Sequence, residues 1–430
     1  MWIERAVKQS KHVIPVKNSA PVLISNGAEQ VIQYHLSNDF VVTAEEDGVV
    51  KEINDKTKLI ILEYQPKGQP VYYKAINYGK TIDKNGAGGF FLSNNLEHKL
   101  TEGKKFKKDD VLAYDSKFFS DTLFGNKFNI GSLQKIACMS EFSAFEDSTY
   151  VTKKAAHDMA AEVVMEKAIT LGKNATVDKI VKVGDKVLVG DELIVFENSF
   201  EEESLNKLLG NIGDELKEEV RSIGKTPIKS KYSGVIEDIQ IYTGSDPETL
   251  SPSLKKLVTD YWKDIKAKKK VLNKYDSHND VYKCGLLLNQ PDHPIETRDG
   301  KIKGEKVDDG VLIIFYIKYE DIVSIGDKVT FFTALKGTVG DVIPEGYEPF
   351  ALSEPDEEIS LSVAPAAVIA RMTPSILLTM GGYKVLVDLK KKLKEIYESW
   401  QNFIIRKHQH SINHVYLLHT WFPPMENGEL

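Results

Sequence analysis

The sequence predicts a β-dominated protein of mixed α/β class, built from several modules and carrying a long helix near its C-terminus. Short β-prone runs separated by Gly and Asp turns recur along most of the chain. A nearly unbroken apolar run at 311–322 predicts a core strand buried on both faces. With 430 residues, 42% of them hydrophobic, the chain can form cores for about two to four domains.

Charge and cysteine content restrict the class of protein. The formal net charge is −7, which disfavours a protein that coats nucleic acid with its whole surface, so contact with nucleic acid must be local. Cys138 and Cys284 lie far apart and form no CxxC, so neither a zinc site nor a disulfide framework is indicated. His408, His410 and His414 have no carboxylate or Cys at ligand spacing and are interpreted as part of a polar tail.

Hydropathy indicates a soluble intracellular protein. No stretch reaches the roughly 18 to 20 apolar residues that a membrane helix needs. The N-terminal residues lack the apolar run of a secretory signal.

The first half of the chain alternates strands with one expected helix. Residues 40–65 form short apolar runs broken by Asp47-Gly48 and similar turns, which predicts a β-meander. Residues 153–168 are rich in strong helix formers and predict a helix.

Residues 175–197 repeat a Val-x-x-Gly-Asp pattern that is typical of small barrel-sandwich hybrid modules, the fold that biotinyl and lipoyl carriers also use. A carrier would need a lysine at the tip of an exposed hairpin, usually framed by Met. Lys186 instead follows a Gly-Asp turn and no Met-Lys pair is present, so a structural role is favoured.

Three further helices are expected. Residues 251–275 predict a helix with a basic end, whose lysines either touch nucleic acid or form a solvated face. Residues 384–405 predict an amphipathic helix. Another amphipathic helix is acidic and spans about 203–221; its stripe either docks on a partner or packs on its own module, and includes Leu205, Leu208, Leu209 and Ile212.

The segment 326–372 carries the clearest chemical signal. Lys328 follows a Gly-Asp turn, Lys336 precedes Gly337, and Arg371 closes the segment. Turn lysines are usually solvated, but fixed cations on an apolar, Gly- and Pro-punctuated segment indicate contacts with phosphates. The apolar residues between the two lysines predict that the chain folds back there, so that both lysines project toward one cleft.

Three strings carry a resemblance to a known family: "KIACMSEFSAFEDSTYVTKKA", "GDKVTFFTALKGTVGDVIPEGYEPF" and "DEEISLSVAPAAVIARMTPSILL". Together they resemble the C-terminal half of the β subunit of multisubunit DNA-dependent RNA polymerases. The chain is similar to the split β subunits of giant bacteriophages, and most of all to the non-virion enzyme of giant Bacillus phages. Between its two lysines it departs from the bacterial family, whose polar string is replaced by Phe331, Phe332, Thr333, Ala334 and Leu335.

The resemblance implies a division into modules around a double-psi β-barrel. A flap of barrel-sandwich type, with the tip helix at about 203–221, interrupts the barrel. The implied boundaries are a β-rich N-terminal module at 1–129, the barrel at 130–175 and 310–372, the flap at 176–309, and a C-terminal helix and tail at 373–430.

The resemblance also implies roles at a nucleotidyl-transfer site. Lys328 and Lys336 match lysines that contact phosphates of the transcript end or of the initiating nucleotide, and Arg371 matches an arginine on the triphosphate. Either Glu146 or Asp147, not both, would approach the second Mg²⁺, directly or through water, because adjacent residues of an extended segment point opposite ways. The acidic cluster for the primary Mg²⁺ would come from a β′ partner, so the chain alone would be inactive.

The implied partners are an N-terminal β fragment, β′ fragments, a promoter-specificity factor at the flap tip, template DNA, the transcript and nucleoside triphosphates, without a membrane. The implied location is the cytoplasm of the infected bacterial host. The alternative function is a non-catalytic adaptor or carrier-like protein built of barrel-sandwich modules.

Overall fold

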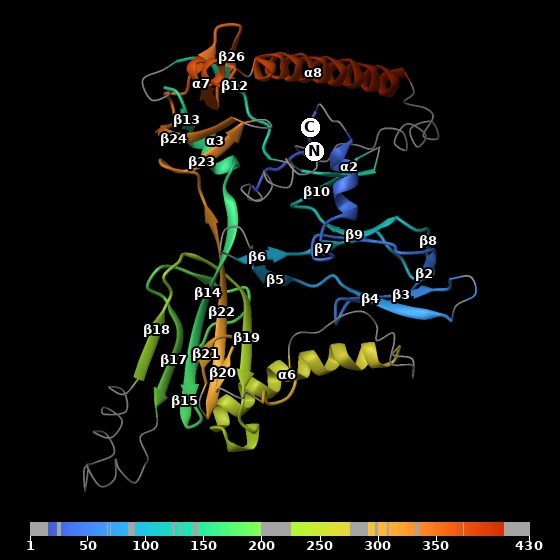
Figure 1. The fold of residues 1–430 in the computed structure, drawn as a ribbon, viewed down its shortest axis with the longest axis vertical. Helices are drawn as coiled ribbons and strands as arrows, with labels where there is room; N and C mark the ends of the chain where they lie inside the picture. Colours follow the sequence, from blue (N-terminus) through green and yellow to red (C-terminus); the bar gives the residue numbers. More distant parts are fainter. Residues whose placement is uncertain are drawn as a thin grey trace.

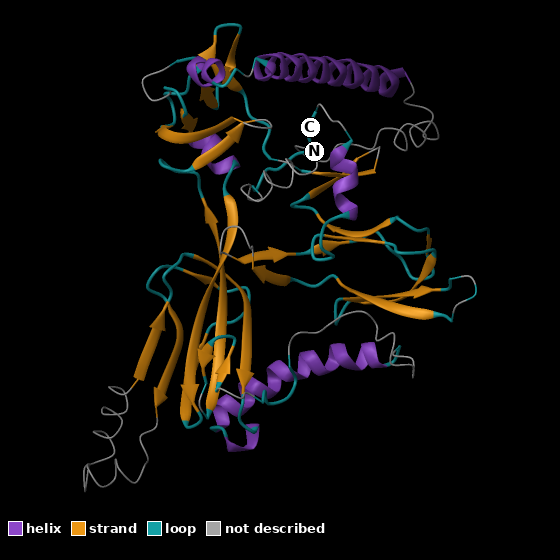
Figure 2. Ribbon diagram, viewed as in Figure 1, coloured by secondary structure: helices purple, strands orange, loops and turns teal. Residues whose placement is uncertain are grey.

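The computed structural model describes residues 16–23, 27–66, 68, 70–84, 91–122, 125–129, 131–140, 145–198, 225–275, 291–296, 300–307, 309–331, 335–372 and 374–407. Strands dominate these residues, as expected, and helices cover single faces or ends (Figure 2). Long strands in the middle of the molecule connect three regions: an N-terminal module, the region expected to be the flap, called the flap below, with its helix, and a C-terminal sheet with a projecting helix (Figure 1).

The N-terminal module is a set of small antiparallel sheets. The strands expected at 40–65 are present, but only 48–54 and 59–64 pair with each other as in a meander, because 41–43 pairs with 111–115 of another sheet. The core of the module contains Val50, Ile60, Leu62 and Phe106, all buried. The strands and short helices of this module are α2 Ala28–Val31, η1 Ile32–Tyr34, β1 Val41–Thr43, β2 Gly48–Asn54, β3 Leu59–Tyr64, β4 Tyr72–Asn77, β5 Thr81–Lys84, β6 Phe91–Asn94, β7 Leu96–Glu97, β8 Lys105–Phe106, β9 Val111–Asp115, β10 Phe119–Thr122 and β11 Gly125–Phe128.

A six-stranded sheet links the N-terminal module to the flap, because it contains strands of both, in the order β16-β19-β22-β14-β6-β5. β14 (Ala161–Gly172) pairs antiparallel with β22 (Gly310–Asp321) along its whole length, from Ala161 opposite Asp321 to Gly172 opposite Gly310. Residues 310–317 of β22 are all buried, which confirms the core strand predicted at 311–322 in its first part, whereas residues 320–322 are exposed. β22 also pairs with β19 (Gly234–Thr243), so this strand is the centre of the flap sheet.

The prediction of a helix at 153–168 is correct only for its first six residues and wrong for the rest. α3 spans only Lys153–Asp158, with the Thr152 side chain accepting a hydrogen bond from the Ala155 amide at its start. The following residues form β14, because both edges of this segment find strand partners in β22 and β6. Tertiary pairing therefore overrides the helix propensity of the Ala, Met and Glu residues.

The flap packs a second sheet against the first. β15 (Ala175–Ile180), β17 (Glu192–Asn198) and β18 (Lys225–Lys229) form this sheet, and β16 (Lys186–Val187) joins the first one. The flap core includes Leu193, Ile236 and Phe315, each buried. The expected tip helix at about 203–221, with Leu205, Leu208, Leu209 and Ile212, lies outside the described residues.

Helix α6 (Pro252–Asn273) confirms the helix predicted at 251–275 and bridges two regions. The Ser251 side chain accepts a hydrogen bond from the Leu254 amide at its start. Leu254 and Trp262 lie in the flap core, whereas Leu272, near the other end, packs with Leu59 and Ile61 of β3. The helix therefore ties the flap to the N-terminal module (Figure 1).

The C-terminal region is a mixed sheet in the order β12-β27-β13-β24-β23. Its core contains Val151, Phe331, Val339, Leu361 and Val368, all buried. The elements are β12 Ile136–Cys138, β13 Ser148–Thr152, β23 Lys328–Phe331, β24 Leu335–Ile343, β25 Phe350–Ala351, β26 Glu354–Glu358, β27 Leu361–Val363, α7 Pro365–Ala370 and α8 Ser375–Lys407. The double-psi connection and the module boundaries stay predictions.

Helix α8 confirms the amphipathic helix expected at 384–405 and starts earlier, at Ser375. Short strands β20 (Lys301–Ile302) and β21 (Glu305–Lys306) and the 3-10 turn η2 (Pro247–Thr249) complete the described elements. No helix within the described ranges is long and apolar enough to cross a membrane. His408, His410 and His414 lie outside those ranges.

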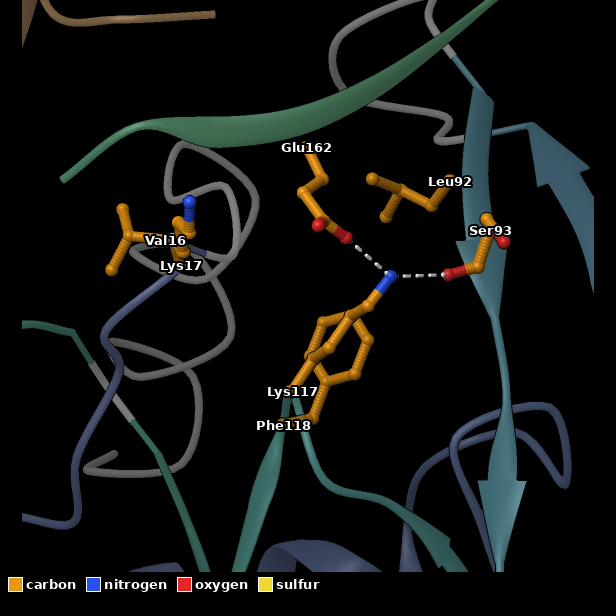
Figure 3. Close-up of a pocket in the computed structure, with 7 residues that line it drawn as sticks. All are labelled: Val16, Lys17, Leu92, Ser93, Lys117, Phe118 and Glu162. Atoms are coloured by element: carbon orange, nitrogen blue, oxygen red, sulfur yellow. Dashed lines mark hydrogen bonds and ion pairs between the residues drawn. The ribbon is translucent and has the colours of Figure 1, made fainter. Parts of the chain in front are cut away.

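A polar junction joins the N-terminal module to the long central strands. The Lys117 ammonium lies 2.9 Å from the Glu162 carboxylate and 3.0 Å from the Ser93 carbonyl oxygen, in a small pocket that Figure 3 shows. Next to it, the buried Glu237 of β19 accepts a 2.7 Å hydrogen bond from the Ser93 hydroxyl. Lys318 of β22 lies 3.7 Å from Glu237. Side chains from the N-terminal module and from all three long strands thus meet at one point.

Candidate functional site

The two candidate lysines lie on one face of one β-hairpin. β23 and β24 pair antiparallel, with Lys328 opposite Thr338 and Thr330 opposite Lys336. Side chains of opposed residues, and of residues two positions apart, share a face of the sheet. Lys328 and Lys336 are therefore diagonal neighbours, and both are exposed.

The other face of the hairpin is apolar and fixes it in place. Phe331, Leu335 and Val339 are buried in the core of the C-terminal sheet. Gly337 lies between them, and a Cβ added there would meet the Phe331 ring at 3.0 Å and the Asp147 carbonyl oxygen at 3.3 Å. Since the alternation along both strands is strict, burial of one set of residues orients the two lysines outward.

Asp147 lies immediately beside this hairpin. β13 begins at Ser148 and pairs parallel with β24, with Ser148 next to Thr338. The Thr338 amide donates a 2.7 Å hydrogen bond to the Asp147 carbonyl oxygen. The row Ser148, Thr338 and Lys328 therefore crosses three adjacent strands, and Asp147 stands at its end.

A tight turn presents the acidic pair. The Ser148 amide donates a 3.0 Å hydrogen bond to the Phe145 carbonyl oxygen, which closes a turn around Glu146 and Asp147. Glu146 has a φ of 50°, a left-handed conformation that is uncommon and strained for a residue with a side chain. Both residues are exposed.

Arg371, at the end of helix α7, contacts the acidic turn. Helix α7 ends at Ala370, and Arg371 follows it as the C-cap residue. An Arg371 Nη2 atom lies 2.7 Å from Asp147 Oδ2. This ion pair is open to solvent, because 39% of the Arg371 side chain and 56% of the Asp147 side chain are exposed.

Lys328 and Lys336 thus form an exposed cationic face of the hairpin, and Arg371 and Asp147 form an ion pair at the acidic turn that precedes the neighbouring strand. Lys328 and Lys336 have no acidic partner among the described residues, whereas Arg371 is paired with Asp147. The Glu146 side chain makes no hydrogen bond or ion pair within the same part of the chain. An exposed face with two unneutralised ammonium groups and an adjacent guanidinium can bind phosphate groups of a ligand.

The acidic residues of this surface are too few to hold a metal ion alone. No group of three or more His, Cys, Asp or Glu residues is arranged as a metal site in the described ranges. Asp147 contributes one exposed carboxylate and Glu146 a second. Oxygen ligands of this kind suit Mg²⁺, which commonly takes one or two carboxylates from a protein chain.

Two residues whose backbone positions the Asp147 segment were not predicted from the sequence. Thr338 anchors Asp147 through its amide, and Gly337 permits the close approach of the Asp147 segment. The Lys-Gly-Thr order was the available signal, since a glycine inside a strand often marks the close approach of another backbone.

Comparison with known proteins identifies the family of the chain. The family RNA polymerase Rpb2, domain 6, matches residues 134–413, more than half of the chain and a range that includes all five candidate residues. The chain belongs to this family. It is thus a β-type subunit of a multisubunit DNA-directed RNA polymerase, a component of a larger complex. No curated protein is similar enough to the chain to count as a match.

Proposed function

We propose that this chain is the C-terminal part of a split β subunit, as in giant bacteriophages, and that it supplies the cationic side of a nucleotidyl-transfer site completed by a β′ partner. One observation carries the proposal. Lys328 and Lys336 share an exposed hairpin face whose neighbouring strand is preceded by Asp147, and Arg371 joins that carboxylate. The cations are thereby pre-positioned by buried β-structure.

The reaction requires charge neutralisation. The 3′-hydroxyl of the transcript attacks the α-phosphorus of a nucleoside triphosphate; a bond forms between O3′ and the α-phosphorus, the bond to the bridging oxygen breaks, and pyrophosphate leaves. Lys328 and Lys336 neutralise phosphates of the transcript end or of the initiating nucleotide. Arg371 can orient the triphosphate through the two parallel N–H groups of its guanidinium.

Arg371 must exchange partners for this role. Its guanidinium contacts Asp147 at 2.7 Å, and the pair is exposed, so an incoming triphosphate can displace the carboxylate at small energetic cost. The freed Asp147, or the adjacent Glu146, would then hold the second Mg²⁺ together with carboxylates from the partner. Bound Mg²⁺ would stabilise the charge that develops on the attacking and leaving oxygens.

The remaining assignments follow from the same proposal. A flap tip carrying Leu205, Leu208, Leu209 and Ile212 would receive a promoter-specificity factor. Other partners are an N-terminal β fragment, β′ fragments, template DNA and the transcript. The complex would act in the cytoplasm of the infected bacterium.

The adaptor and carrier alternatives have less support. A non-catalytic adaptor has no need for an exposed cationic hairpin face beside an ordered acidic turn. Lys186, the lysine that a carrier function would use, lies in β16 and pairs with Val235 of β19, not at a hairpin tip.

The test is reconstitution with candidate partner subunits and measurement of RNA synthesis. The double variant Lys328→Ala/Lys336→Ala should assemble with wild-type stoichiometry and lose activity by about 10²-fold or more. A matched control is available in the flap, because Lys186 occupies the same Gly-Asp-Lys-Val context as Lys328. Lys186→Ala should leave the rate unchanged, and wild-type rates from the double variant would refute the proposed roles.

A further inference from the structure

Helix α8 carries an uncovered apolar stripe. Leu378, Val385, Leu389, Leu393, Ile396 and Trp400 are between 42 and 79% exposed. At about 100° per residue these six side chains fall on one side of the helix. The stripe runs for about 33 Å from Leu378 to Trp400, at about 1.5 Å per residue.

The opposite side of α8 faces its own domain. Ile376 is buried in the core of the C-terminal sheet and Met380 packs against that core. One turn further, Lys384 forms ion pairs with Glu354 of β26 and, at 2.8 Å, with Asp388. Lys391 forms an ion pair with Glu357. These contacts orient the helix so that its apolar stripe lies on the side away from the domain to which it is attached. Figure 1 shows α8 projecting from that domain.

The borders of the stripe are basic. Lys392 lies along one border and Lys390 along the other, whereas Lys394 lies on the side of the helix that carries Ile376. None of the three has an acidic partner among the described residues, in contrast to Lys384 and Lys391. Burial and the nearby charge of Lys394 lower the pKa of Lys390. The acidic residues Glu395 and Glu398 lie on the remaining faces.

We propose that the apolar stripe of α8 docks an amphipathic helix of another polypeptide, with acidic residues on both sides of the helix's apolar face. An apolar face presented outward is stabilised when a second apolar face covers it. Unneutralised lysines on both borders select acidic flanks, since opposite charges along a helix pair fix orientation and partner choice. The stripe is long enough for a partner helix of about six turns.

The experiment uses the full chain and two synthetic helices that share one Leu and Ile stripe. One peptide has Glu along both flanks and the other has Lys, and binding is measured by fluorescence anisotropy of labelled peptide. The acidic peptide should bind at least tenfold more tightly than the basic one. Raising the salt concentration to about 1 M should reduce this difference, because charges at the border are screened.

Two variants isolate the determinants. Val385→Gln/Leu389→Gln/Ile396→Gln keeps strong helix formers in α8 and should weaken binding of the acidic peptide at least tenfold. Glu398→Gln, on a different face of the same helix, should bind like the wild type. Lys390→Glu/Lys392→Glu should reverse the preference between the two peptides. Circular dichroism establishes that each variant retains its helix.

Three outcomes would overturn the proposal. The first is that neither peptide binds, or that both bind equally. The second is a dimer in sedimentation that the triple Gln variant abolishes, which would make a second copy of this chain the occupant. The third is that the acidic peptide binds a chain shortened to residue 407 but not the full chain, which would mean that residues 408–430 of the chain itself cover the stripe. None of these depends on RNA synthesis, so they leave the proposed function to its own test.

Discussion

The Arg371 guanidinium and the Asp147 carboxylate lie 2.7 Å apart although 224 positions separate them in the chain. Each comes from an element end: Asp147 precedes β13, and Arg371 follows α7. Their contact is exposed, so its value lies in the placement of two charged groups and not in the stability of the fold.

Asp147→Asn should therefore separate stability from activity. An exposed ion pair contributes about 0 to 1 kcal/mol, so the free energy of unfolding in urea should change by less than about 1 kcal/mol. RNA synthesis by the reconstituted polymerase should fall by about 10²-fold. Asp121→Asn, which breaks the exposed ion pair with Lys99, should change neither quantity. A loss of stability well above 1 kcal/mol in Asp147→Asn would indicate a structural role instead.

Gly337→Ala should displace the acidic turn. The new methyl group would lie 3.0 Å from the Phe331 ring and 3.3 Å from the Asp147 carbonyl oxygen, both closer than ordinary contact. Overpacking of this kind costs about 1 to 3 kcal/mol, measurable by thermal or urea unfolding, and RNA synthesis should fall with it. Gly381→Ala in α8 is the control, because its methyl group meets no atom within 4 Å. This control should stabilise the chain by about 0.5 to 1 kcal/mol.

Glu237 should make the junction sensitive to acid. Burial alone would raise its pKa, but the Ser93 hydroxyl and the charges of Lys318 and Lys80 outweigh burial and hold the pKa below its ordinary value of 4.5. The folded state thus binds the proton less tightly than the unfolded state, so this stabilisation is present above about pH 4.5 and disappears as the pH falls through the lowered pKa.

Glu237→Gln removes this contribution. The free energy of unfolding of the variant should be about 1 to 3 kcal/mol lower at neutral pH, because the buried side chain no longer carries a charge that pairs with Lys318 and Lys80. Urea unfolding measured at falling pH should show a shallower decline for the variant below about pH 5. Glu248→Gln, at an exposed ion pair with Lys255, should follow the wild-type curve. A variant curve parallel to that of the wild type would contradict the assigned role of Glu237.

Leu272→Ala should loosen the link between flap and N-terminal module. Leu272 is buried against Leu59 and Ile61 at the far end of α6. Its truncation to Ala should lower the free energy of unfolding by about 2 to 4 kcal/mol. Hydrogen exchange should accelerate in β3 and at the end of α6. Leu254→Ala, at the other end of the helix, should instead accelerate exchange in the flap sheets. Identical exchange patterns in the two variants would show that α6 does not connect separable units.

Local periodicity made much of this fold predictable from the sequence. The strands within 40–65, the strand within 311–322, and the helices at 251–275 and 384–405 each have a repeat that matches one element type. The segment 153–168 failed because its residues favour a helix while its neighbours in space, β22 and β6, are strands. No signal within that segment reports those neighbours.

In the candidate site, too, the local features were predictable from the sequence and the contacts between distant segments were not. The apolar residues between Lys328 and Lys336 indicated a fold-back, and the structure has a hairpin there. The parallel pairing of β13 with β24 and the contact between Arg371 and Asp147 join distant segments, and composition and spacing do not encode such contacts. The resemblance named these residues together, whereas their arrangement came from the structure.

The long ladder between β14 and β22 has a consequence for the order of folding. A ribosome must add all of residues 173–309 after β14 before β22 exists to pair with it, which takes about 10 to 30 s at usual rates of synthesis. Pairing of β14 with β22 then brings β13 and β24 near each other, because only α3 separates β13 from β14 and only β23 separates β22 from β24. The cationic surface is therefore among the last features of the nascent chain to take shape, after the flap between its halves has been made.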